Sequence, residues 1–129
     1  METRLADRYK IHRKAVLRID KNSEQQFSLV EGNSFKVDML DIGILGVGII
    51  FRYFLPRGLK VHLVIKGTLF GLSKTMKVEG EICHCEQIDY RVHKCGVKFL
   101  NISKRHKDAI RQLVSTYEKR RVPRLKLSK

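Results

Sequence analysis

The sequence predicts a mainly β protein, a six-stranded antiparallel β-barrel followed by one C-terminal α-helix. Apolar and polar residues alternate in short segments along residues 15–102, and this period of two is typical of half-buried strands. No helical pattern interrupts them, which favours antiparallel connections and closure into a small barrel. After residue 102 the apolar residues recur every three or four positions, as on one face of a helix. The 129 residues are enough for one domain with its own core.

Six segments have the strand pattern. A polar connection, residues 20–33, follows the first strand, and LPRG at 55–58 predicts a turn. In the second segment the alternation places four residues on one side, namely Phe35, Val37, Met39 and Asp41. The expected strands are 15–19, 34–42, 47–54, 59–67, 75–88 and 90–102.

The helical segment is predicted over 103–120. Ser103 is a suitable N-cap residue, and Pro123 is expected to end any continuation. One helical face is apolar and is expected to pack on the barrel: Ile110, Leu113, Val114 and Tyr117. The organisation is then an N-terminal arm at 1–14, the barrel at 15–102, the helix at 103–120 and a basic tail at 121–129.

The charge is strongly positive. The 27 lysines and arginines exceed the 13 acidic residues, which gives a net charge of +14 and a pI of about 10.1. One basic cluster precedes the first strand, and the final segment KRRVPRLKLSK contains no acidic residue. This balance favours an anionic partner, although a solvated basic surface would have the same composition.

Several classes of protein are excluded by what the sequence lacks. It has no P-loop, no GxGxxG and no interpretable Ser/His/Asp spacing, so we do not expect an enzyme. No apolar run approaches the ~20 residues of a membrane span. The polar N-terminus is unlike a signal peptide, so a cytoplasmic location is expected.

The three cysteines raise the question of a metal site, because Cys83, Cys85 and Cys95 lie near histidines on adjacent predicted strands. Alternation places Cys95 on the core face of its strand and the other two cysteines on the outer face. A bulge at Gly96 would change this phase. Without one, the cysteines point to opposite sides, and no metal site is expected.

Anion binding has two candidate features, the arginines before the first strand and the run LDIGILGVGI at 40–49. A carboxylate at Asp41 can accept hydrogen bonds from the N1 and N2 donors of guanine, and arginines bind phosphates or stack on purines. Glycines let a planar ligand approach the backbone. The alternative is structural: Asp41 caps a bend, and glycines such as Gly48 relieve a barrel corner.

These segments resemble the PilZ domain family, bacterial receptors of cyclic di-GMP, over about residues 8–120. The family motif (D/N)xSxxG, between the second and third strands, is similar to DIGILG at 41–46, with Gly43 in the serine position. The motif RxxxR, just before the first strand, matches Arg13 at its second arginine, with Tyr9 at the first and Arg8 beside it. The segments LPRGLKVHLVI and CGVKFLNIS resemble the family's fourth and last strands.

The resemblance implies the same barrel and a cyclic di-GMP site without a further cofactor. It implies that arginines contact phosphates or guanine faces, an aspartate reads the guanine edge and glycines make room: Arg8, Arg13, Asp41, Gly43 and Gly46. Binding would order residues 1–14, a change that a protein partner could sense. By resemblance, that partner belongs to motility, secretion or exopolysaccharide machinery.

Two alternatives remain open. Tyr9 and Gly43 depart from the family motifs, which fits a degenerate PilZ-like interaction module that binds no nucleotide. The basic tail would suit a nucleic-acid binder, but the sequence offers no platform of exposed aromatic residues and no nucleic-acid motif.

Overall fold

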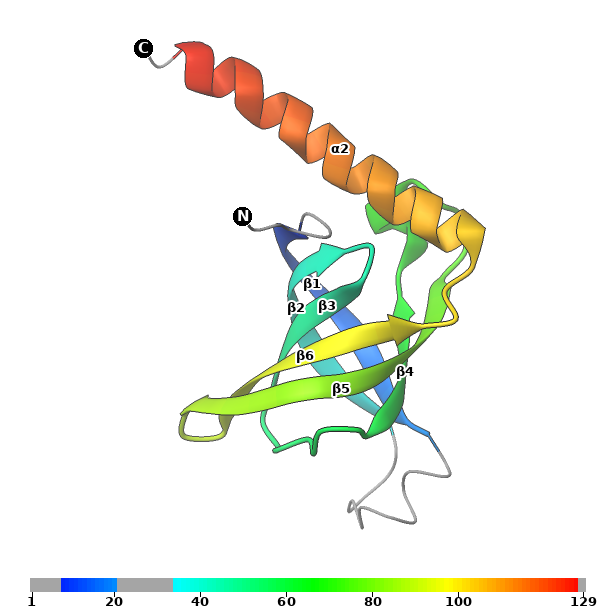
Figure 1. Cartoon of the computed structure of the whole chain (residues 1–129), viewed down its shortest axis with the longest axis vertical. Coiled ribbons are helices and arrows are strands. Elements are labelled where there is room, and N and C mark those ends of the chain that lie inside the picture. The colour runs from blue at the N-terminus through cyan, green and yellow to red at the C-terminus, as the bar shows by residue number, and fades with distance from the viewer. Residues whose placement is uncertain (1–7, 21–33, 128–129) are drawn as a thin grey trace.

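The computed structural model describes residues 8–20 and 34–127, and in this part of the chain six strands close into an antiparallel barrel (Figure 1). The strand order around the barrel is β1-β2-β3-β6-β5-β4, so β1 closes it against β4. The predicted fold class is therefore confirmed. The elements are β1 (Arg8–Ile19), β2 (Ser34–Gly43), β3 (Gly46–Phe51), β4 (Lys60–Ile65), the short 3-10 helix η1 (Gly67–Phe70), β5 (Met76–Asp89), β6 (Val92–Leu100) and α2 (Lys104–Leu127).

The core fills the barrel from all six strands. Alternate residues point inward, so that β1 buries Leu17 and Ile19 and β4 buries Leu63 and Ile65. Ile110 of α2 is also fully buried in this core. The helix is therefore attached to the barrel through its first turns.

The first strand begins earlier than the sequence predicted. We expected an arm at 1–14, but residues from Arg8 onward pair with β2. A register shift between Lys10 and Arg13 breaks the period of two, because Ile11 and Ala15 are buried whereas Arg13 is exposed. Because of this bulge, residues 8–14 do not alternate between apolar and polar, and the start of the strand was not predicted. The rest of the expected arm, residues 1–7, lies outside the described residues.

The helix begins as predicted, with the Ser103 hydroxyl accepting a hydrogen bond from the His106 N–H at 3.1 Å. Its predicted end is wrong, since the backbone stays helical through Pro123 to Leu127. An interior proline costs about 3 kcal/mol but does not forbid a helix, and good helix formers flank this one in the sequence. The last two residues of the expected tail, 128–129, lie outside the described residues.

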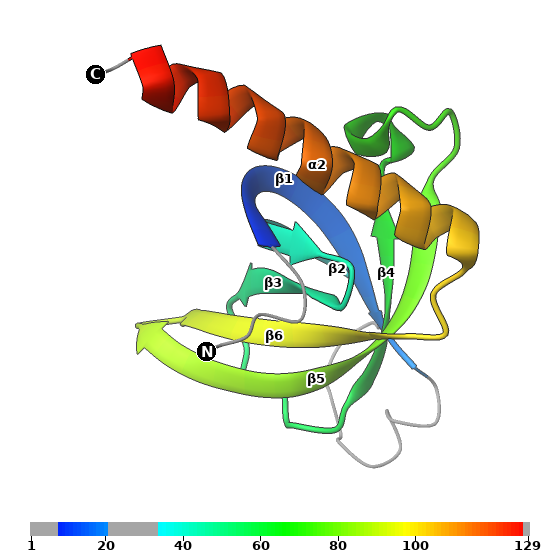
Figure 2. The ribbon, with the colours of Figure 1, turned by 45° about the horizontal axis from the view of Figure 1, so that its top comes forward.

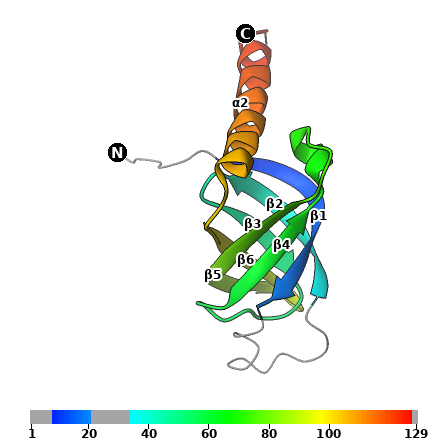
Figure 3. The ribbon, with the colours of Figure 1, turned by 90° about the vertical axis from the view of Figure 1, so that its right-hand side faces the viewer.

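Among the described residues, helix α2 has its main contacts with a few elements of the barrel. It contacts β1, β2 and η1 at one end of the barrel, where Figure 2 shows it crossing near β1. Figure 3 shows its C-terminal half extending away from the strands. None of the helices in the described ranges has a stretch long and apolar enough to cross a membrane.

Candidate functional site

Asp41 lies on the outside of the barrel because of a second bulge. The pairing of β2 with β3 shifts register between Met39 and Asp41, and Met39 and Ile42 are both fully buried. One extra residue reverses the side on which the following residues point. The prediction that Asp41 shares the face of Val37 and Met39 is therefore wrong, and its side chain is 27% exposed.

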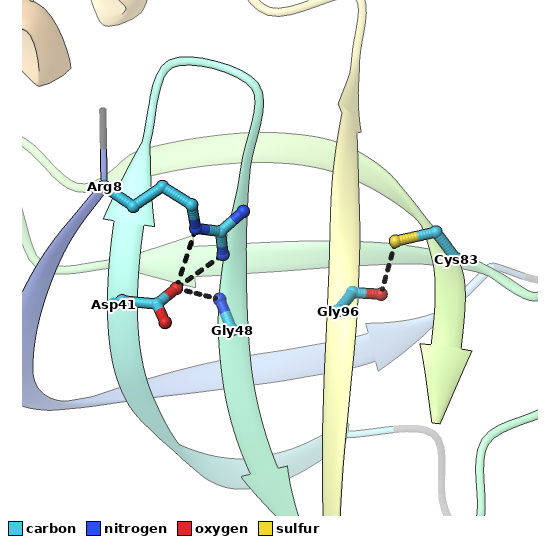
Figure 4. Close-up of polar contacts among 5 residues, drawn as sticks. All are labelled: Arg8, Asp41, Gly48, Cys83 and Gly96. Carbon is cyan, nitrogen blue, oxygen red and sulfur yellow. Dashed lines mark hydrogen bonds and ion pairs between the residues drawn. The ribbon is translucent and has the colours of Figure 1, made fainter. Parts of the chain in front are cut away.

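The carboxylate of Asp41 gathers three donors on one oxygen (Figure 4). Oδ1 accepts hydrogen bonds from Nε of Arg8 at 3.1 Å, from Nη2 of Arg8, and from the N–H of Gly48 at 3.1 Å. The Arg8 side chain is 43% exposed, and an ion pair so accessible to water contributes only ~0–1 kcal/mol. Arg8 and Asp41 are thus positioned by these hydrogen bonds, but their ion pair is weak enough for a competing ligand to replace it.

A row of paired residues crosses five strands at this level of the barrel. Each residue is the direct pairing partner of the next, in the order Lys10 of β1, Asp41 of β2, Gly48 of β3, Gly96 of β6 and His84 of β5. Directly paired residues point to the same face of a sheet. The two glycines, which we call the glycine floor, therefore lie between Lys10 and Asp41 on one side and His84 on the other.

The side chains of Asp41 and His84 lie over the glycine floor from its two sides. A Cβ added to Gly48 would lie 2.9 Å from Oδ1 of Asp41, and one added to Gly96 would lie 2.3 Å from Nε2 of His84. Neither glycine has a positive φ. Glycine is therefore needed at these positions because a side chain would not fit, and not because of the backbone conformation. Room for the Asp41 carboxylate explains Gly48 better than a barrel bend does.

The model of the PilZ domain matches residues 2–116, which is most of the chain. The chain belongs to the PilZ domain family. None of the curated protein sequences compared with this PilZ chain is significantly similar to it.

Solved structures share the PilZ fold at low sequence identity. The inhibitor of motility MotI/DgrA of Bacillus subtilis matches with a TM-score of 0.70 and 10% identity, covering 92% of this chain and 52% of its own. YcgR of Escherichia coli in complex with c-di-GMP matches at 0.65 and 12%, covering 98% and 50%. The PilZ domain of YcgR with c-di-GMP matches at 0.61 and 15%, covering 99% of each chain. This chain spans about half the length of MotI and YcgR.

The residues that match the second PilZ motif have different surroundings. Gly43 ends β2 as the pairing partner of Arg8, so the serine position of the motif lies beside an arginine. Gly46 is buried and pairs directly with Lys98, and a Cβ added there would lie 2.2 Å from the carbonyl oxygen of Val97. Gly46 is thus explained by the close approach of β3 to β6, and its proposed contact with a ligand stays a prediction.

The two arginines predicted for the site, Arg13 at the second position of the first motif and Arg8 beside its first position, face different parts of the surface. Arg8 contacts Asp41, whereas Arg13 follows the β1 bulge and is paired with Met39. Arg13 lines a separate basic cavity of about 290 Å³, whose lining contains neither Arg8 nor Asp41: His12, Arg13, Lys14, Ile65, Lys66, Thr68 and Leu69. Only one of the predicted arginines is therefore beside the carboxylate in this conformation.

The sequence pattern did not predict that His84 and Gly96 lie in the same row of paired residues as Asp41. Their pairing depends on a third bulge, at Cys83, which a period of two cannot show. The same bulge corrects the interpretation of the cysteines. We expected the cysteines to share a face only if β6 had a bulge at Gly96. The bulge is instead in β5, and it places Cys85 directly opposite Cys95. Across residues 8–20 and 34–127, no group of three or more potential ligands is arranged to hold a metal ion.

Proposed function

We propose that this PilZ chain is a receptor for cyclic di-GMP and that the ligand binds over the glycine floor beside Asp41. The observation that supports this most is the arrangement of Asp41, whose Oδ1 oxygen accepts hydrogen bonds from Arg8 and from the Gly48 N–H on the outside of the barrel. Family membership and two c-di-GMP complexes among the similar folds point to the same ligand. The matching family is a receptor module, and it indicates no catalytic role.

The chemistry of binding follows from an exchange of partners. Asp41 can accept two hydrogen bonds from the N1 and N2 donors of guanine, one on each oxygen. Arg8 would then leave the carboxylate and contact a phosphate, for which its planar guanidinium is well suited. Because the exposed Arg8–Asp41 pair is worth little, the exchange costs little.

His84 and Lys10 complete the proposed site from its two sides. The His84 ring lies over Gly96 and offers a flat face on which a base can stack. Lys10 is exposed and directly opposite Asp41, where it can neutralise a phosphate. Arg13 would reach the ligand only from the far side of the β1 bulge, so we assign it a smaller contribution than Arg8.

Signalling to a partner is the further part of this proposal. A component of motility, secretion or exopolysaccharide machinery would read the change that ligand binding makes around Arg8 at the start of β1. For this role we propose a location in the cytoplasm.

Isothermal titration with cyclic di-GMP tests the proposal. We expect binding by the wild type, loss of binding in Asp41→Asn, and unchanged binding in the matched control Asp38→Asn. Asp38 is an exposed aspartate of the same strand that pairs with Lys14 instead. No heat with the wild type, in a protein shown to be folded by circular dichroism, would overturn the proposal.

One observation favours a second candidate, an interaction module without a ligand. Large apolar side chains are exposed on the β3–β4 connection and at the β5–β6 hairpin: Tyr53, Phe54, Ile88 and Tyr90. Together with glycine in the serine position of the motif, this surface suits docking of a protein. Absence of nucleotide binding in the titration would favour this candidate.

A further inference from the structure

Two cysteine thiols face each other across adjacent strands of the barrel. Cys85 of β5 and Cys95 of β6 are direct pairing partners, and their Sγ atoms are 3.0 Å apart. Direct partners in an antiparallel pair have Cα atoms about 4.5–5.5 Å apart, within the range that a disulfide spans. A bond between the two sulfurs therefore needs a movement of the sulfurs by about 1 Å and no rearrangement of the strands.

The two sulfurs have different environments. Sγ of Cys85 accepts a hydrogen bond from the Cys95 thiol and another from the N–H of Leu55 at 3.3 Å. Cys85 is only partly buried, whereas Cys95 is fully buried. Burial, then the hydrogen bond to Cys85 and the charge of that neighbour, raise the pKa of the Cys95 thiol far above its ordinary value. Cys95 is thus kept as a protonated donor, and Sγ of Cys85 is the sulfur that accepts both hydrogen bonds.

We propose that Cys85 and Cys95 form a thiol modification site at which a hydroperoxide produces an intrachain disulfide. Cys85 is the attacking sulfur because it is accessible and receives both hydrogen bonds. Cys95 is the resolving sulfur because it is already in contact and cannot be reached from solvent. This site is separate from the proposed nucleotide site and does not depend on it.

The chemistry balances with the hydroperoxide as oxidant. The Cys85 thiolate attacks the terminal oxygen, the O–O bond breaks, and protonation of the leaving oxygen releases an alcohol or, from hydrogen peroxide, water. This step gives a sulfenic acid on Cys85. The Cys95 sulfur then attacks the Cys85 sulfur, the S–O bond breaks, and water leaves with the Cys95 proton. In total two thiols are oxidised, and one peroxide is reduced. A thiol reductant reverses the disulfide.

Cys83 serves as the internal control for this assignment. It is the extra residue of the β5 bulge, it is exposed, and its thiol donates to the carbonyl oxygen of Gly96 at 3.3 Å, as Figure 4 shows. Reactivity governed by exposure alone would favour Cys83. Reactivity governed by the paired geometry favours Cys85 with Cys95.

The test is mild oxidation of the folded full-length chain with stoichiometric hydrogen peroxide, followed by thiol counting and peptide mapping. We expect two of the three thiols to be lost, a Cys85–Cys95 cross-linked peptide, and Cys83 free for alkylation. Dithiothreitol should restore all the thiols. Oxidation in guanidinium chloride should give mixed pairings, which shows that the native fold selects the pair.

Variants test the order of events. Cys83→Ser should form the same disulfide as the wild type. In Cys95→Ala the reaction should stop at a sulfenic acid on Cys85, which dimedone labels. The proposal is overturned if the native wild type keeps all its thiols, cross-links through Cys83, or forms only disulfides between chains. Because the wild-type map alone decides this, failure of a variant to fold would not weaken the test.

Discussion

Arg8 and Asp41 are 33 residues apart in the sequence and form an ion pair on the outside of the barrel, where Nε of Arg8 lies 3.1 Å from Oδ1 of Asp41. The β2 bulge brings the carboxylate out, and the early start of β1 brings the arginine to it. The two halves of the proposed nucleotide site are therefore already in contact with each other. Binding would have to replace this contact rather than assemble the site from distant parts.

Replacement of Asp41 and Arg8 tests that exchange. A hydrogen bond to a charged group contributes about 1.5–3 kcal/mol, so Asp41→Ala and Arg8→Ala should each weaken cyclic di-GMP binding about 10-fold to 100-fold or more. Arg13→Ala should also weaken it, but less, since Arg13 lines the separate basic cavity. Titration calorimetry measures the three affinities. A larger loss in Arg13→Ala than in Arg8→Ala would show that the arginines exchange roles when the ligand binds.

Restoring the family motif should increase affinity. Gly43→Ser returns the hydroxyl of the second motif, which can add a hydrogen bond worth about 1 kcal/mol, or roughly fivefold in affinity. Tyr9→Arg returns the first arginine and should add more, because its hydrogen bonds carry charge. The double variant is the most informative. If it binds and the wild type does not, the chain is a receptor that has lost its ligand, and the interaction-module candidate gains support. If neither binds, the assignment of Arg8, Arg13 and Asp41 to the site is wrong.

The helix should separate into a part needed by the barrel and a part that is not. Ile110 is fully buried in the core, so Ile110→Ala should lower the free energy of unfolding by about 2–5 kcal/mol. Deletion of 121–129 should leave unfolding cooperative and nearly unchanged, because Figure 3 shows the end of α2 extending away from the strands. Urea unfolding followed by circular dichroism compares the two. A large loss of stability on truncation would show that the basic end of the chain contacts the barrel.

The sequence predicted the number of strands, their order along the chain and the helix because alternation and helical period reflect burial directly. Val37 with Met39 and Leu63 with Ile65 follow the rule of two, and each is buried. The predicted helix is wrong at its C-terminal end, where Pro123 is a local penalty rather than a prohibition, and the side chain of Tyr117 lies outside the described part of the predicted apolar face.

The site was less predictable because three bulges shift the phase where its residues lie. The period of two placed Asp41 on the inner side, hid the start of β1 at Arg8 and separated Cys85 from Cys95. A bulge depends on the backbone geometry of a pair of strands, and no single strand reveals it. Resemblance to a family pointed to Asp41, since a motif keeps its spacing whatever the phase, and to Arg8 as the arginine beside the first motif position. The family motifs could not predict His84, because only the pairing of β5 with β6 places this residue beside Gly96.

The same substitution at two glycines should have different consequences for stability. In Gly46→Ala the new Cβ would lie 2.2 Å from the backbone carbonyl of Val97, so the paired strands must separate, and unfolding should become easier by about 1–3 kcal/mol. In Gly96→Ala the atoms nearest to the new Cβ would be those of the His84 ring, with Nε2 at 2.3 Å, and that exposed side chain can rotate away. Stability should then change little, while cyclic di-GMP binding falls because both the floor and the stacking ring are altered. His84→Ala should reduce binding alone, and Gly96→Ala should add little to the loss in that background. Urea unfolding and titration of the wild type, the three single variants and the Gly96→Ala, His84→Ala double variant measure both effects. Equal destabilisation at the two glycines would show that His84 is fixed rather than free to move.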